Sequence, residues 1–170
     1  MQSIEDDIKL ISEVWGSEDA LRSVLQSEVR RLCRLVCGPK SKSPAIDLRP
    51  SLMSNGVLPS NSGLRSAEYE PANGGEATII LFPSACTDKG ILTVAIAHEL
   101  IHHWELTVPP KRRAQEYPQA AEELIRSAFK DRTKERIWRS GHSAKFVSKA
   151  VDIARKLEIS LLRMLVHRGP

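Results

Sequence analysis

The sequence has no run of apolar residues that approaches the roughly 18 needed for a membrane-spanning helix. It also lacks the basic start and apolar stretch of a secretory signal, because Glu5, Asp6 and Asp7 make its beginning acidic. We therefore expect no membrane contact, and we expect a cytoplasmic location.

Cysteine is scarce, with Cys33, Cys37 and Cys86 the three in 170 residues. An odd and sparse set does not provide a disulfide framework. Cys33 and Cys37 are four residues apart on an expected helix, but no second cysteine pair completes a metal site. We interpret them as buried free thiols.

Internal repeats and low-complexity tracts are also missing. A chain of 170 residues with a hydrophobic fraction of 41% fits one domain with a core of its own. The formal net charge of +4 is only mildly basic. It permits a nucleic acid or another acidic partner but does not require one.

The first part of the chain is expected to be helical over residues 1–40. Apolar residues recur at helical spacing after Ser17-Glu18-Asp19, which has the character of a helix start, and Gly38-Pro39 is a stop signal. Residues 39–66 are rich in Ser, Pro, Asn and Gly, and they predict a loop with at most one short strand.

A hairpin and a central helix are predicted next. Residues 67–70 and 77–82 have strand character and flank a Pro- and Gly-containing turn at 71–75. The more apolar strand, 77–82, is expected in the sheet core or along a cleft. Apolar residues then surround the segment from Ile91 to Trp104 on nearly all sides, which predicts a buried helix.

The chemistry-bearing motif lies on this central helix, where the segment from His98 to His102 has the pattern HExxH. The two histidines are four residues apart and share one helix face, so both imidazoles can reach one zinc ion at roughly 2.0–2.1 Å. Glu99 is placed to hold a water molecule beside the metal and to take its proton. Such polar groups in a buried helix are costly without a partner, so the pattern predicts Zn²⁺.

The residues that follow the motif have a different expected role. His103 points about 100° away from His102 around the helix, so it cannot bind the same metal ion. We expect His103 at the surface or behind the ligands, and Trp104 in the core.

The third zinc ligand has two sets of candidates. One is His142, where Gly141 is expected to let the chain turn tightly so that His142 projects from the start of the last helix. The other is Glu122 or Glu123 on a helix predicted from residue 119 to 129. Glu122 follows His102 by twenty residues, a separation that thermolysin-like gluzincins also use.

The stretch from Ala97 to Trp104, together with Gly141 to Phe146, resembles the SprT-like (Spartan-type) zinc metallopeptidases. The resemblance covers roughly residues 76–157. It implies a small zincin-like α+β domain in which a short mixed sheet packs on the HExxH helix. It also implies Glu99 as the catalytic base and three zinc ligands, which are His98, His102 and His142.

The expected organisation is one SprT-like domain over residues 1–170. Its parts are the N-terminal helices (1–40), the hairpin and active-site helix (67–106), an insertion (107–140), and the third-ligand helix with an apolar tail (141–170). The tail from Ile159 to Val166 is expected to pack back on the core.

We expect a zinc-dependent endopeptidase whose protein or peptide substrate lies extended along the edge of strand 77–82. The resemblance adds DNA-associated proteins as a substrate class. Three alternatives stay open: a gluzincin-type protease, a toxin or effector metalloprotease with a narrow protein target, and a non-catalytic DNA-binding module stabilised by zinc.

Two further questions stay open in the sequence. Tyr69, Tyr117 and several arginines are candidates for stabilising the oxyanion. The basic residues of the insertion fit either a DNA contact or a solvated surface, and we favour the second. They are Lys111, Arg112, Arg113, Lys130, Arg132, Lys134, Arg136 and Arg139.

Overall fold

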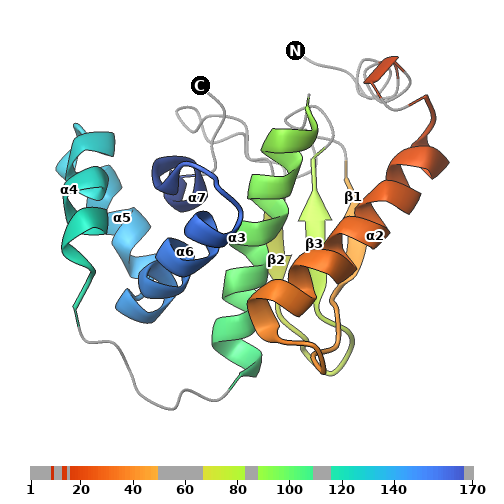
Figure 1. Ribbon diagram of the computed structural model, residues 1–170, viewed down its shortest axis with the longest axis horizontal. Helices are drawn as coiled ribbons and strands as arrows, with labels where there is room; N and C mark the ends of the chain where they lie inside the picture. The colour runs from red at the N-terminus through yellow and green to blue at the C-terminus, as the bar shows by residue number, and fades with distance from the viewer. Residues whose placement is uncertain are drawn as a thin grey trace.

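The computed structural model describes residues 16–49, 67–82, 88–108 and 116–166, together with Lys9, Glu13 and Val14. These residues form an α+β fold, as predicted (Figure 1). In chain order the elements are α2 (Glu18–Cys37), β1 (Ala45–Leu48), β2 (Ala67–Glu70), β3 (Thr78–Leu81), α3 (Lys89–Thr107), α4 (Gln119–Ala128), α5 (Arg132–Gly141), α6 (Ala144–Lys156) and α7 (Leu161–Val166). Cys86, Lys111, Arg112 and Arg113 lie outside the described residues.

The three described strands form a mixed sheet in the order β1-β3-β2. β2 and β3 are antiparallel, with Ala67 opposite Leu81 and Glu70 opposite Thr78, which confirms the predicted hairpin. β1 runs parallel to β3 on its other side. The predicted core position of strand 77–82 is confirmed, but its role as a substrate edge is wrong, because β1 and β2 occupy both of its sides.

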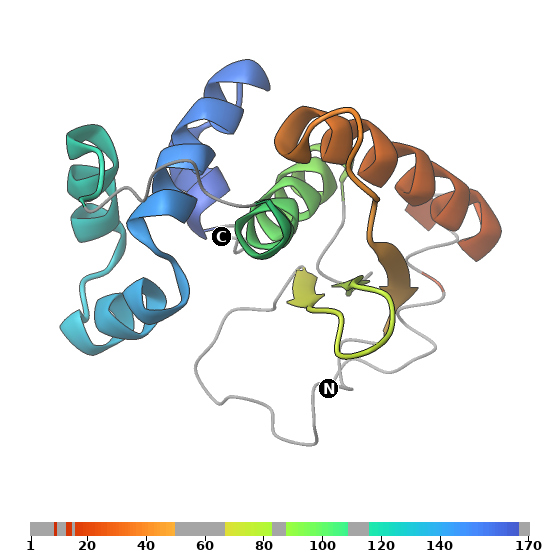
Figure 2. The same cartoon turned by 90° about the horizontal axis from the view of Figure 1, so that it is seen from below.

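Helices α2 and α3 cover one face of this sheet (Figure 2). The side chain of Ser17 caps α2 by accepting a hydrogen bond of 3.1 Å from the Ala20 amide. The helix ends at Gly38, whose φ of 103° is open to glycine but rarely adopted by other residues. Both ends agree with the predicted start and stop signals. On the buried face of α2, Leu25, Val29 and Leu32 have no exposed surface and belong to the core.

Helix α3 lies between the sheet on one side and α4–α7 on the other (Figure 1). Asp88 caps its start by accepting a hydrogen bond of 2.7 Å from the Ile91 amide. Residues on several sides of the helix, including Ala95, Ile96 and Leu100, have no exposed surface. The prediction of a buried central helix is therefore confirmed.

The segment predicted as an insertion contributes to the core. Ala121 and Ile125 of α4 have no exposed surface, and Trp138 of α5 is 9% exposed. These three positions of the predicted insertion are therefore part of the core. The predicted tail does pack back, since Met164 and Leu165 of α7 are fully buried. None of the helices in the described ranges combines the length and apolar character needed to cross a membrane.

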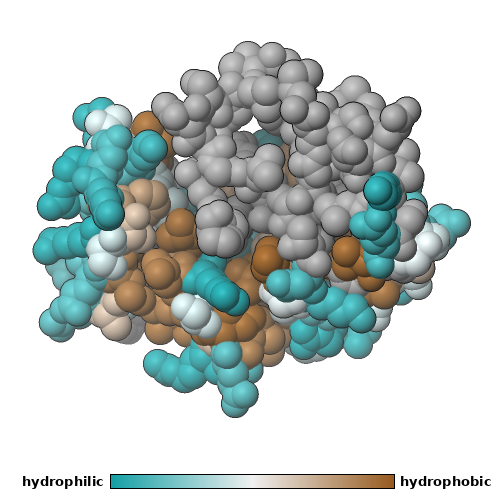
Figure 3. Space-filling view, turned by 90° about the horizontal axis from the view of Figure 1, so that it is seen from above, coloured by the Kyte–Doolittle hydropathy of each residue, from teal (hydrophilic) through white to brown (hydrophobic). Residues whose placement is uncertain are grey.

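The outer surface of α4 and α5 is hydrophilic, as the left side of the space-filling view shows (Figure 3). Lys130, Arg132, Lys134 and Arg136 are exposed on these helices and the turn between them. The two helices therefore bury one face and present charged residues on the other.

Candidate metal centre

Three imidazole rings meet where α3 faces the junction of α5 and α6. His98 and His102 come from α3, and His142 is the residue that caps the end of α5. Their ring centroids form a nearly equilateral triangle with sides of 5.1, 5.1 and 5.0 Å. Three imidazoles bound to one tetrahedral ion have ring centres about 5 Å apart. The three side chains can therefore hold a metal ion, with one ligand atom from each within 4.8 Å of the others.

Hydrogen bonds fix the orientation of two of these rings. Nδ1 of His98 lies 2.7 Å from the Met164 carbonyl oxygen, and Nδ1 of His142 lies 2.7 Å from the Trp138 carbonyl oxygen. A carbonyl oxygen only accepts, so both Nδ1 atoms donate. In the neutral rings the lone pair is then on Nε2, the atom that a metal ion would bind.

The two Nε2 atoms of His98 and His142 are 3.1 Å apart. Ligand nitrogens at 2.0–2.1 Å from a tetrahedral zinc ion are separated by about 3.3 Å. Two lone pairs this close repel each other unless a proton or a metal ion lies between them. With His102 as the third converging ring, the donor set fits a metal ion.

Two aromatic residues pack against the three histidine rings. The Phe146 ring is fully buried and lies 4.9, 4.5 and 4.7 Å, centroid to centroid, from His98, His102 and His142. Trp138 stacks on His142 at 4.2 Å with only 6° between the ring planes. Sequence reasoning missed Trp138, because its spacing of four residues before His142 becomes a signal only once helix α5 is recognised.

A pocket of about 490 Å³ opens beside the three histidines. Glu99 lines it, is only 4% exposed, and directly follows His98 on α3. Gly141 also lines the pocket as the last residue of α5. Its backbone is helical and not left-handed, so the conformational freedom of glycine is not what turns the chain here. His142 lies between the end of α5 and Ser143, the residue that caps the start of α6.

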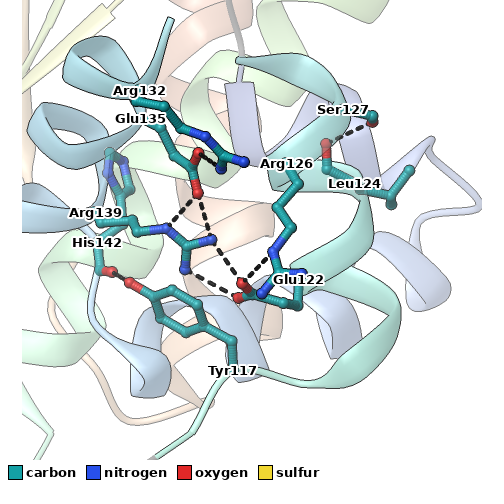
Figure 4. A network of polar contacts seen from close by, with 9 residues as sticks. All are labelled: Tyr117, Glu122, Leu124, Arg126, Ser127, Arg132, Glu135, Arg139 and His142. Atoms are coloured by element: carbon teal, nitrogen blue, oxygen red, sulfur yellow. Dashed lines mark hydrogen bonds and ion pairs between the residues drawn. The ribbon is translucent and has the colours of Figure 1, made fainter. Parts of the chain in front are cut away.

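The carboxylate candidates for the third ligand lie elsewhere (Figure 4). Glu122 accepts two hydrogen bonds of 2.9 Å from Arg139 and one of 3.1 Å from Arg126. The Arg139 guanidinium also binds Glu135, and it holds the pKa of both carboxyl groups below the ordinary value. Neither Glu122 nor Glu123 is among the residues that line the pocket, and Glu123 is exposed.

The two tyrosines have different environments. Tyr117 donates a hydrogen bond of 2.6 Å to the His142 carbonyl oxygen, and the Arg139 guanidinium lies 4.8 Å from its ring centroid. Tyr117 does not line the pocket, whereas Tyr69 of β2 does. Burial raises the pKa of Tyr69, whose hydroxyl lies 3.0 Å from Nδ1 of His103. Of the two tyrosine candidates for stabilising the oxyanion, only Tyr69 therefore lines the pocket.

His103 is buried, not at the surface, with 6% of it exposed. Its ring belongs to a different group of side chains from the three ligand candidates. Burial lowers the pKa of His103. Trp104 is half-buried against the core, with the ammonium groups of Lys145 and Lys149 at 4.5 and 4.8 Å from its ring centroid.

Comparisons of the chain with protein-family models, with curated proteins and with solved structures gave no match. The case for a function therefore depends on the chemistry of the site itself.

Proposed function

We propose that this protein is a zinc-dependent endopeptidase of SprT-like type, with His98, His102 and His142 as the ligands of Zn²⁺. The observation that carries the proposal is the separation of 3.1 Å between the Nε2 atoms of His98 and His142, beside a pocket. Neutral imidazoles are good ligands for zinc, and a catalytic zinc site uses three protein ligands and one open position. A closed structural site would instead need a fourth protein ligand.

When bound, zinc would lower the pKa of a coordinated water molecule to about 7 and polarise the scissile carbonyl. Glu99 accepts the proton of the attacking water and passes it to the leaving amine. Glu99 is buried and lines the pocket together with His98, His102 and His142. The carbonyl groups of Met164 and Trp138 hold His98 and His142 in the tautomer that offers Nε2.

The substrate is proposed to lie along β2. Among the described strands β2 is at an edge of the sheet, and its residues Ala67, Glu68 and Tyr69 line the pocket. The outer side of an edge strand can pair with an extended peptide through main-chain hydrogen bonds. β3 has both sides paired and cannot do so.

The alternatives receive less support from the site. A gluzincin needs the Glu122 carboxylate at the metal, but Arg139 and Arg126 bind that carboxylate. A DNA contact through α4 and α5 is weakened because Arg126, Arg132 and Arg139 form ion pairs within these helices. We therefore favour a protein substrate without a DNA requirement.

Cleavage of a mixture of unfolded proteins tests this proposal, with new peptide termini identified by mass spectrometry. We expect cleavage by the zinc-loaded chain, loss of cleavage in the presence of a chelator, and recovery when zinc is restored. Failure of the zinc-loaded chain to cleave any component of the mixture would contradict the endopeptidase assignment.

A further inference from the structure

A second group of metal-ligating side chains lies where α2 packs against α3. Cys33 and Cys37 of α2 and His103 of α3 each place a ligand atom within 4.8 Å of the others. Cys33 has no exposed surface, and His103 is 6% exposed. The next residue along α3 from His102 thus serves a different cluster.

A backbone oxygen adds a fourth donor to this group. The Lys42 carbonyl oxygen lies 3.8 Å from Sγ of Cys33 and 3.2 Å from Nε2 of His103. Around a tetrahedral zinc ion, with sulfur at about 2.3 Å and nitrogen or oxygen at about 2.0–2.1 Å, such pairs are separated by about 3.6 and 3.3 Å. As the side chains stand, both contacts are hydrogen bonds donated to the Lys42 carbonyl oxygen. Their lengths are close to the separations of ligands that share one ion, so a metal ion could replace the two hydrogens with little movement.

The other nitrogen of His103 has the partner that a metal ligand needs. Nδ1 lies 3.0 Å from the hydroxyl oxygen of Tyr69. A histidine that binds a metal through Nε2 donates its Nδ1–H group to an oxygen, which fixes the orientation of the ring. As the ring stands, Nε2 donates to the Lys42 carbonyl oxygen, so Nδ1 accepts from the Tyr69 hydroxyl. A metal ion on Nε2 would move the ring proton to Nδ1, and the Tyr69 hydroxyl could then accept that hydrogen bond.

A disulfide between Cys33 and Cys37 explains the cluster less well. Residues four apart on a helix have Cβ atoms about 5–6 Å apart, whereas a disulfide requires about 3.5–4.5 Å. Both cysteines lie within α2, so a disulfide would distort the end of the helix. A metal ion accepts the wider spacing without that distortion.

We propose that Cys33, Cys37 and His103, with the Lys42 carbonyl, form a structural zinc site. Two thiolates and an imidazole select a thiophilic ion. The site would link α2 and the residues that follow it to α3, on a different face of α3 from the three-histidine centre. It is independent of the proposed hydrolysis, and it replaces the interpretation of the two cysteines as plain buried thiols.

Cobalt substitution tests the second site without any activity measurement. Sulfur ligation gives Co²⁺ a thiolate-to-cobalt charge-transfer band in the near ultraviolet, and a centre made only of histidines lacks that band. We expect the metal-free full-length chain to bind two Co²⁺ ions and to show the band. A variant with both His98→Ala and His142→Ala should bind one Co²⁺ ion and keep the band.

Cys33→Ser should lose most of the band, and Cys86→Ser is the matched cysteine control that should keep it. If the Cys33 variant does not fold, the cobalt spectra of the unaltered chain and of the Cys86 control still decide. A cobalt-saturated chain without the thiolate band would overturn the proposal, and so would a band that disappears in Cys86→Ser.

Discussion

The carboxylate of Glu122 is bound by the guanidinium of Arg139 through two hydrogen bonds of 2.9 Å (Figure 4). A paired geometry of this kind is among the stronger hydrogen-bonded ion pairs in proteins. It gives Glu122 a structural partner away from the pocket and makes His142 the better third ligand.

His142→Ala should therefore lower the zinc affinity of the three-histidine centre by at least about 100-fold. Loss of a residue that only hydrogen-bonds a metal ligand usually lowers the affinity by about 10–100-fold. Glu122→Ala should leave that affinity within about twofold, because the carboxylate does not contact the metal. Competition with a chromophoric chelator, in a background carrying Cys33→Ser and Cys37→Ser, isolates this centre. Equal losses in the two variants would argue against His142 as the ligand.

Glu99→Gln should keep the metal and the fold but reduce peptide hydrolysis by about 10²–10⁴-fold. Glutamine keeps the shape of the side chain and cannot accept the proton. Zinc content and cleavage rate are measured on the same preparation. Glu123→Gln is the matched control, since Glu123 is exposed on α4, and it should cleave at the normal rate. Normal cleavage by the Glu99 variant would remove its assigned role.

Trp138 is expected to hold His142 in position from two sides. Its ring stacks on the imidazole, its carbonyl oxygen accepts from Nδ1, and its Nε1–H donates to the Leu165 carbonyl oxygen at 3.1 Å. Trp138→Ala should cost about 3–5 kcal/mol in the free energy of unfolding and weaken zinc binding about 10–100-fold.

Trp138→Phe keeps an aromatic ring, so it should lose less stability and less zinc affinity than Trp138→Ala. Urea unfolding of the metal-free chain gives the stability, and chelator competition gives the affinity. If Trp138→Ala binds zinc as tightly as the unaltered chain, the stacked ring does not position the ligand.

The ion-pair network of α4 and α5 should make stability depend on acid pH. Arg139 lowers the pKa of Glu122 and Glu135 below the ordinary 4.5. Because the folded values are lower than the unfolded ones, the network stabilises the fold above pH 4.5, and this contribution is lost as the pH falls through the folded values. Arg139→Gln should thus be less stable than the unaltered chain at pH 7.

The difference in urea midpoint between Arg139→Gln and the unaltered chain should narrow below pH 4.5. The variant Arg136→Gln is the control, since Arg136 is exposed on the same helix. A difference that stays constant from pH 7 to the acid range would show that the carboxylates are not the source of the effect.

Local sequence patterns predicted the features that depend on neighbours along the chain. Ser17 was a recognisable helix start because its side-chain oxygen can cap a following amide. The histidine pair of α3 was recognisable because a spacing of four residues fixes the face of a helix. The hairpin followed from two segments of strand character, 67–70 and 77–82, around a short turn that contains Pro and Gly.

Contacts between distant segments could not be predicted in the same way. The partner of the His98 Nδ1 atom is the carbonyl group of Met164, 66 residues away. A carbonyl group is common to every residue, so no side-chain pattern marks it. Helix α5 was missed because its exposed side is strongly charged, and its buried residues Glu135 and Trp138 acquire their partners only in the folded chain.

Diffraction data collected at the zinc absorption edge, on crystals of the zinc-loaded chain, test the central claim most directly. We predict an anomalous peak at roughly 2.0–2.1 Å from the Nε2 atoms of His98, His102 and His142, with Glu122 still bound to Arg139. The absence of a peak among the three histidines would contradict the metal centre. A peak whose third protein ligand is the carboxylate of Glu122 or Glu123 would contradict the assignment of His142.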